Sequence, residues 1–319
     1  MPANAVSTSV PVSDPPPRRH TRNRTSLTPW LFAAPALSLF ALFLVIPIGY
    51  AIYLSFRGYR VEGGGGFGRR VETFIGFDNY QAVFTDHEYL AGLGRVLVYG
   101  LIAIPSVLGL ALVFALLLDT PRVRARSFAR TAIFLPYAVP GVIASLLWGF
   151  LYLPSTSPLN YIAERLHTGP LDFFSYPALY FSLANIALWS GVGFNMVIIF
   201  TSLRAIPTSI YEAARIDGAS ELQIAMRIKI PLVAPALVLT GLFSVIGTLQ
   251  LYSEPATLRP ITTTVSSTWV PLMKIYQEAF MNDNLGGAAA ASVVLALGIL
   301  AVSLLLLRFF QHRAFGDNS

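Results

Sequence analysis

The sequence predicts an all-α membrane protein with six transmembrane helices, and three observations support that fold class. The chain has 319 residues, of which 55% are hydrophobic and 12% charged, about half the charged fraction of a typical soluble domain. Six separate apolar runs each have the roughly 20 residues needed to cross a bilayer core. These runs contain no Asp, Glu, Lys, Arg or His, and they are continuously apolar rather than alternating, which excludes a transmembrane β-barrel.

The runs give the elements in chain order. Residues 1–29 are rich in Pro, Ser and Arg and predict a disordered tail. The first run is too long for the h-region of a cleaved signal peptide, so we expect it to be retained. The six-helix domain then covers residues 30–310, and a short tail of residues 311–319 follows. The predicted spans are Trp30–Tyr53, Val96–Leu118, Thr131–Leu153, Leu183–Leu203, Val233–Leu251 and Ala288–Leu307.

Six spans place both termini on one side of the membrane, and the basic residues indicate which side. The segments on the side of the termini carry a net charge of +8 and the other segments −2, which together give the +6 of the whole chain. The positive-inside rule therefore predicts a multi-pass protein of the plasma or inner membrane with cytoplasmic N- and C-termini. The basic surplus sets the orientation in the membrane and does not indicate binding to nucleic acid.

The segments on the opposite side differ in content. Residues 54–95 form a long first loop, residues 154–182 a loop with one short helix, and residues 252–287 a loop with a short helix near Val270–Phe280. The first loop contains Gly63–Arg70, whose glycines have the spacing of a phosphate-binding loop. However, Arg occupies the positions where that loop requires Lys and Ser or Thr. We interpret it as a loop tip, and no nucleotide-binding motif is predicted.

The chemistry of the chain points to transport without an energy source of its own. Cys is absent, which excludes thiol catalysis, iron–sulfur clusters and Cys-ligated zinc. The four histidines lie in different segments, so neither a metal site nor a catalytic residue is predicted. Spans without Asp, Glu, Lys, Arg or His offer no group that titrates near neutral pH for a coupling proton or sodium ion. Any uphill transport must therefore be driven by another polypeptide.

The loop of residues 207–231, between the fourth and fifth spans, carries the most specific signal. Two prolines bracket two short helical patterns, each opened by a pair with capping-box spacing: Ser209–Glu212 and Ser220–Gln223. Gly218 between them suits a left-handed turn. Such a helix–turn–helix can dock in the groove of a partner or lie on lipid headgroups, and its periodicity favours neither.

This loop also carries a family resemblance. It reads Glu212-Ala213-Ala214, three residues, Gly218, nine residues, and Ile228-Lys229-Ile230-Pro231. That pattern resembles the EAA loop of ABC importer permeases, written EAA, three residues, G, nine residues, I-x-L-P, with Ile230 in place of Leu. The resemblance implies a type I ABC importer permease fold, with a coupling helix that docks on a cytosolic ATPase. The implied ATPase-coupling residues are Glu212, Ala213, Ala214, Asp217, Gly218, Ile228 and Pro231.

The resemblance extends from about residue 29 to 310 and has the character of carbohydrate importers. Phe74–Tyr80 and Leu135-Pro136-Tyr137 are similar to segments of those permeases, whereas residues 254–260 lack the Gly-Gly-Pro turn that is frequent there. It implies a second permease subunit, two cytosolic ATPase subunits that bind ATP and Mg, an extracytoplasmic solute-binding protein, and a small sugar or polyol as substrate. It implies no cofactor bound by this chain.

Polar residues in or beside the spans are candidates for the solute pathway, because solutes cross such permeases near the bilayer midplane. Asn195 and Gln250 are the strongest, since a buried amide needs several hydrogen-bond partners. Tyr252 and Glu254 follow directly after the fifth span and are weaker. Trp189 and the serines of the spans are more typical of interfacial anchoring and helix packing.

Two other functions remain as alternatives. A stand-alone secondary carrier or facilitator fits the polar groups in the spans, but it leaves the loop of residues 207–231 without a role. A membrane-embedded enzyme is disfavoured, because acids and histidines do not cluster near any span end.

Overall fold

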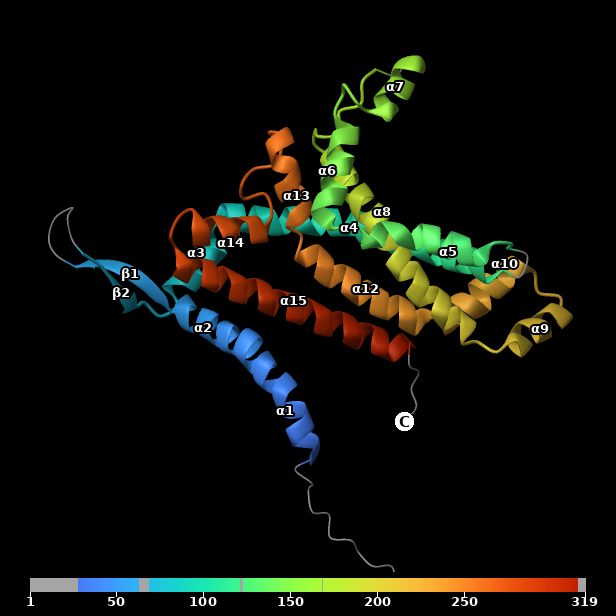
Figure 1. The fold of residues 1–319 in the computed structure, drawn as a ribbon, viewed down its shortest axis with the longest axis horizontal. Coiled ribbons are helices and arrows are strands. Elements are labelled where there is room, and N and C mark those ends of the chain that lie inside the picture. Colours follow the sequence, from blue (N-terminus) through green and yellow to red (C-terminus); the bar gives the residue numbers. More distant parts are fainter. Residues whose placement is uncertain (1–27, 63–68, 121–122, 168, 315–319) are drawn as a thin grey trace, which may run out of the picture. The chain divides into compact units, whose positions relative to one another are not determined.

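A computed structural model describes residues 28–62, 69–120, 123–167 and 169–314 (Figure 1). The predicted N-terminal tail, apart from its last two residues, and the glycines at 63–66 lie outside the described residues. The chain divides into two compact units, Met1–Gly49 and Tyr50–Ser319, and each is described by itself.

The first unit contains most of the first predicted span. Helix α1 (Thr28–Phe40) passes through a π-helical turn (Ala41–Val45) into α2 (Ile46–Ser55), whose second half belongs to the second unit. Together they give one apolar stretch, Pro29–Ser55, that is long enough to cross a membrane. Pro35 lies inside α1 without interrupting it.

The second unit opens with a hairpin that the sequence analysis did not predict. Strands β1 (Arg57–Glu62) and β2 (Arg69–Phe74) pair antiparallel, with Arg57 opposite Phe74. Helix α3 (Asp78–Thr85) follows, and the Asn79 amide donates hydrogen bonds of 2.8 Å to the carbonyl oxygens of both Ser55 and Arg57. These bonds fasten the base of the hairpin to α3.

Three unbroken helices match predicted spans and extend beyond them: α4 (His87–Asp119), α8 (Ala178–Arg204) and α15 (Leu285–Ala314). The Asp86 carboxylate begins α4 by accepting the backbone N–H groups of Glu88 and Tyr89, as an N-cap does. The extension of α15 makes residues 311–314 of the predicted C-terminal tail helical. The extension of α4 brings Arg95 and Asp119 into that helix.

The third predicted span is bent rather than straight, and the fifth begins at a bend. Helix α5 (Arg126–Phe134), a 3-10 turn (Leu135–Ala138) and α6 (Gly141–Tyr152) turn by 96°. Val139 and Pro140 have extended backbones with ψ of 125° and 137°, which stops the helical hydrogen bonding between them. The described part of the chain therefore has four helices long enough to cross a membrane, or up to six if each bent pair is one span.

The second bent pair belongs to the loop of residues 207–231 and the fifth span. Helix α10 (Glu221–Ile224), a π-helical turn (Ala225–Lys229) and α11 (Ile230–Leu232) meet α12 (Ala234–Leu249) at 65°. The remaining helices are short: α7 (Pro158–Arg165), α9 (Thr208–Ile216), α13 (Ser253–Leu258) with a 3-10 turn (Arg259–Ile261), and α14 (Pro271–Phe280). Helices α7 and α14 confirm the short helices expected in the second and third loops.

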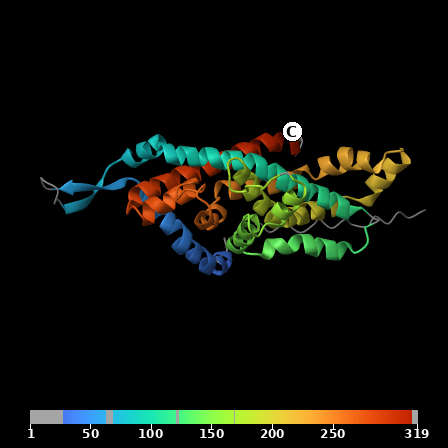
Figure 2. The ribbon, with the colours of Figure 1, turned by 90° about the horizontal axis from the view of Figure 1, so that it is seen from above.

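Within the second unit, α4 packs along α8, and α12 lies between α4 and α15 (Figure 1). Small side chains allow the close approach that helices in membranes favour, and Ala111 and Ala115 of α4 share a buried cluster with Met196 of α8. A Cβ at Gly193 of α8 would strike the Ile133 carbonyl oxygen, so α8 meets the end of α5 backbone to backbone. Figure 2 shows the hairpin at one end of α4, and α9 with α10 at the other.

Candidate functional site

An open cavity of about 520 Å³ lies between α4, α8, α12 and the start of α13. One wall is aromatic, because the rings of Tyr137 and Phe194 stack with centroids 4.8 Å apart. Ser244 and Thr248 on α12 also line the cavity and bring hydroxyl groups to it. A cavity with aromatic faces and separate polar groups suits a small polar solute.

The cavity brings together all four residues predicted for the solute pathway: Asn195, Gln250, Tyr252 and Glu254 line it. The Asn195 amide nitrogen donates to the Gly191 carbonyl oxygen at 2.9 Å. Its amide oxygen is buried and accepts no hydrogen bond within the described part of the chain. A buried acceptor is costly to leave unpaired, which makes this amide a candidate group for binding a solute.

Glu254 gives the cavity a titratable group. It lies in the first turn of α13, and burial raises the pKa of its carboxyl group above the usual value of 4.5. Burial has this effect because it penalises the charged form. Once protonated, the carboxyl group can donate as well as accept a hydrogen bond.

Apart from Tyr252, the sequence analysis missed the aromatic residues of the cavity. Tyr99 of α4 and the stacked pair Tyr137 and Phe194 contribute to the lining. Tyr99, Ala103 and Val107 recur every four residues along α4, and this periodicity was the available signal. Trp189 is absent from this lining and pairs edge to face with Trp148 at 6.2 Å.

The second feature is the loop of residues 207–231, which turns sharply at Gly218. This glycine has φ +83°, a left-handed conformation that residues with a Cβ rarely adopt. The Ala219 N–H donates to the Ala214 carbonyl oxygen at 2.9 Å, and the Gly218 N–H donates to that of Arg215 at 3.0 Å. These two bonds form a Schellman motif that ends α9, as the sequence predicted.

The two predicted capping boxes have different outcomes. In α10 the Ser220 hydroxyl accepts the Gln223 N–H at 3.3 Å, and the Gln223 side chain accepts the Ser220 N–H at 2.8 Å. This box is confirmed. The box at Ser209 is wrong, because Pro207 occupies the N-cap position of α9 and places Ser209 inside the first turn.

The surface of the loop is unusually apolar for a segment outside the long helices. The side chains of Ile216, Leu222 and Met226 are 87%, 72% and 61% exposed. Arg215 and Glu221 form an ion pair of 2.8 Å across the turn. Among the predicted coupling residues, Ala214 and Ile228 are half-buried, and the others are exposed: Glu212, Ala213, Asp217, Gly218 and Pro231.

A buried ion pair, which the sequence analysis also missed, fixes this loop to the helices. Lys229 Nζ lies 2.5 Å from Asp119 Oδ2 at the end of α4, and their side chains are only 8% and 5% exposed. The same Nζ lies 4.8 Å from the ring centre of Tyr211 in α9, a cation–π distance. The pair therefore joins both helices of the loop to α4.

A helical subunit with several membrane-length helices, a polar cavity among them and a projecting apolar loop is the architecture of a membrane transport component. Residues 88–315 match the model of the family described as binding-protein-dependent transport system inner membrane component. The chain belongs to this family of ABC transporter permease subunits. The resemblance seen in the loop of residues 207–231 is confirmed at the level of the family.

Known relatives cover nearly the whole chain. The sn-glycerol-3-phosphate transport system permease protein UgpA of Agrobacterium fabrum is 31% identical over 292 residues, covering 90% of this chain and 96% of that protein. The osmoprotective compounds uptake permease protein GgtC of a Synechocystis species is 31% identical over 288 residues, covering 88% and 98%.

Solved structures show the same fold. A chain of a bacterial ABC transporter involved in the import of the acidic polysaccharide alginate aligns with a TM-score of 0.75 at 21% identity. It covers 89% of this chain and 96% of that one. A second structure of a bacterial alginate ABC transporter, in complex with an alginate pentasaccharide-bound periplasmic protein, aligns with a TM-score of 0.73 at 20% identity.

Proposed function

We propose that this chain is one permease subunit of an ATP-driven importer for a sugar or related polyol. In this proposal it forms half of the solute pathway, beside a second permease subunit. An extracytoplasmic binding protein delivers the solute, and two cytosolic ATPase subunits, which bind ATP and Mg, drive transport. Both termini and the loop of residues 207–231 face the cytoplasm.

The observation that carries this proposal is that α4 contributes both to the wall of the 520 Å³ cavity and to the ion pair that holds the loop of residues 207–231. One end of α4 contributes Asp119 to the ion pair with Lys229 of the loop, and its middle contributes Tyr99 to the cavity wall. An α-helix rises 1.5 Å per residue, so the two positions are about 30 Å apart on one continuous helix. A displacement of the loop by the ATPase would therefore move the wall of the cavity.

The exposed side chains of Ile216, Leu222 and Met226 support docking of the loop on a protein. Apolar side chains presented by a short helix-turn-helix suit a groove in a partner. The coupling role of Glu212, Ala213, Ala214, Asp217, Gly218, Ile228 and Pro231 follows from the family and from their place in this loop. The relatives that transport sn-glycerol 3-phosphate and osmoprotective compounds support a polyol or sugar as solute.

The substitution Gly218→Arg tests the docking. We expect it to abolish co-purification of the ATPase subunit and to leave insertion in the membrane intact. Gly76→Arg is the matched control, because Gly76 also has a positive φ, of +63°, and both glycines have open space where a Cβ would lie. If the ATPase subunit co-purified equally well with the Gly218→Arg and Gly76→Arg variants, this result would contradict a docking role and favour a loop lying on lipid headgroups.

The energy source is tested by reconstitution in liposomes. We expect solute uptake only when this chain is combined with the second permease, the ATPase and the binding protein, and only with ATP. Sustained uptake by this chain alone, without ATP, would establish the competing function of a secondary carrier or facilitator.

A further inference from the structure

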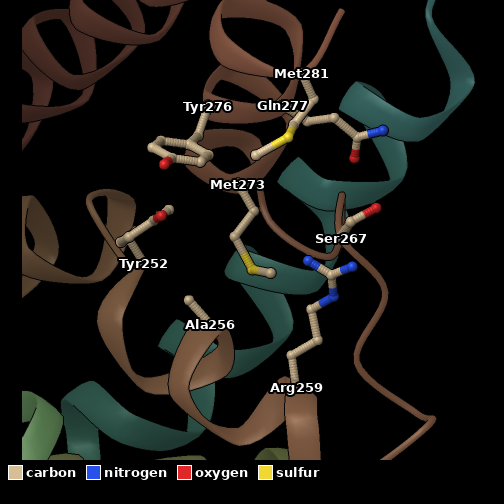
Figure 3. Close-up of a pocket in the computed structure, with 8 residues that line it drawn as sticks. All are labelled: Tyr252, Ala256, Arg259, Ser267, Met273, Tyr276, Gln277 and Met281. Carbon is tan, nitrogen blue, oxygen red and sulfur yellow. The ribbon is translucent and has the colours of Figure 1, made fainter.

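A second cavity, of about 410 Å³, lies between α13 and α14, away from the ion pair of the loop. Figure 3 shows its lining residues. Tyr252 and Tyr276 form one side, with their ring centres 5.9 Å apart and their planes inclined by 49°. Met273, which is buried, lies between this aromatic side and the polar side.

The polar side consists of Arg259, Ser267 and Gln277 (Figure 3). The guanidinium group of Arg259 forms no ion pair with any carboxylate of the described chain. The side-chain oxygen of Gln277 is buried and has no hydrogen-bond partner among the described residues. Buried polar atoms are normally paired, so the unpaired Gln277 oxygen stands out. The exposed Arg259 side chain adds a donor fork to the same side of the cavity.

These two sides together fit one class of ligand. The face of a sugar ring, with its C–H groups, packs on aromatic side chains, and its hydroxyl groups bond to amides and hydroxyls. A guanidinium group binds a carboxylate or phosphate more strongly than a neutral hydroxyl, because it can form a charge-assisted fork with the anion. The arrangement therefore suits a sugar or polyol that carries an anionic group.

Tyr252 connects this cavity with the pathway, because it lines both the 410 Å³ cavity and the 520 Å³ cavity. We propose that the 410 Å³ cavity, called the outer cavity from here on, is a separate binding subsite for an anionic sugar or polyol, held by Arg259, Gln277 and Tyr276. From it the solute passes Tyr252 into the 520 Å³ cavity, called the inner cavity. This proposal rests on the proposed function as an importer. It adds to that function a second binding site on the solute pathway and a preference for anionic solutes.

The test uses the complete transporter in lipid nanodiscs without its binding protein. Its probes are galacturonate and galactose, which differ mainly in the carboxylate, and their binding is titrated by saturation-transfer NMR. We expect Arg259→Gln to weaken galacturonate binding by about tenfold or more, since a charge-assisted bidentate pair is lost, and to leave galactose binding nearly unchanged. Arg60→Gln, at an exposed arginine of the hairpin, is the control and should alter neither.

Two further variants locate the bound sugar. Tyr276→Leu should weaken both sugars, whereas Asn195→Leu, in the inner cavity, should leave galacturonate bound. The subsite is refuted if wild-type transporter binds neither sugar saturably, if Arg259→Gln leaves galacturonate binding unchanged, or if Asn195→Leu abolishes it. ATP-driven uptake by the same variants, reconstituted in liposomes together with the binding protein, separates the two proposals. Uptake with unaltered binding in Arg259→Gln overturns the subsite alone, and sugar binding without ATP-driven uptake overturns the importer alone.

Discussion

Asp119 and Lys229 form the most consequential pair of side chains in the second unit, because both charges are buried at 2.5 Å from each other. Removing one partner of such a pair leaves an uncompensated buried charge, which costs about 3–5 kcal/mol. We expect Lys229→Met to lower the free energy of unfolding by that amount. The double variant Asp119→Leu with Lys229→Met should recover most of it, because an apolar pair needs no compensation.

Unfolding of the detergent-solubilised protein measures these differences. Arg215→Gln is the control, since it breaks an ion pair of 2.8 Å whose side chains are 39% and 51% exposed. Solvent screens exposed pairs, so they contribute little to stability. Similar losses of unfolding free energy in Lys229→Met and Arg215→Gln would contradict this prediction, because the buried Asp119–Lys229 pair would then matter no more for stability than the exposed pair.

Protonation of the Glu254 carboxyl group makes the free energy of unfolding depend on pH. Its pKa in the folded state lies above the unfolded value of 4.5 because of burial, so the folded state binds more protons. Its contribution to stability is therefore fully present below pH 4.5 and is lost as the pH rises through the folded pKa. Glu254→Gln should remove this loss, which thermal unfolding at stepped pH values would measure. Glu164→Gln, at an exposed glutamate, should leave the wild-type profile unchanged, and a Glu254→Gln profile parallel to wild type would contradict the assignment.

At the scale of the elements, the two serines of the loop of residues 207–231 make a matched pair. Ser220 caps α10 and Ser209 does not cap α9. Loss of an N-cap costs about 1 kcal/mol. We expect Ser220→Ala to lower the hydrogen-exchange protection of the α10 amides about fivefold, and Ser209→Ala to leave α9 within about 0.5 kcal/mol of wild type. The reverse order of effects would contradict the capping geometry.

The long helices could be predicted from the sequence, and the bends could not. Uninterrupted apolar runs of sufficient length identified the first, second, fourth and sixth spans. Proline alone did not locate the bends, because Pro35 and Pro105 lie inside unbroken helices whereas Pro140 lies at a 96° turn. Whether a proline ends a helix depends on which neighbours satisfy the freed carbonyl groups, and those neighbours are distant in sequence.

At the scale of the whole molecule, the candidate site, like the helices, could be predicted from the sequence only in part. Asn195 and Gln250 could be predicted as pathway residues because a polar amide within an apolar run must have hydrogen-bond partners. Tyr99, Tyr137 and Lys229 were missed, because aromatic residues are common in spans and basic residues common at loop ends. Only the fold shows that Lys229 meets Asp119, which is 110 residues away in the chain. Spacing motifs therefore predicted the loop better than the cavity.

The continuity of α4 gives a prediction for transport itself. An ion pair fixes one geometry between the loop and α4, whereas an apolar contact allows sliding. In the complete transporter, the double variant Asp119→Leu with Lys229→Met should retain ATP hydrolysis and lose several-fold in solute transported per ATP. Uptake and phosphate release measured on the same liposomes give this ratio. An unchanged ratio would show that movement of the loop reaches the cavity by another route.

The exposed apolar side chains of the loop also bear on how a cell must produce this subunit. A chain made without its partner would present Ile216, Leu222 and Met226 to water, and such patches promote aggregation and capture by chaperones and proteases. If the ATPase covers this patch, as proposed above, the abundance of this chain should follow that of the ATPase subunit. Excess synthesis of this chain alone would raise its turnover rather than its steady-state level.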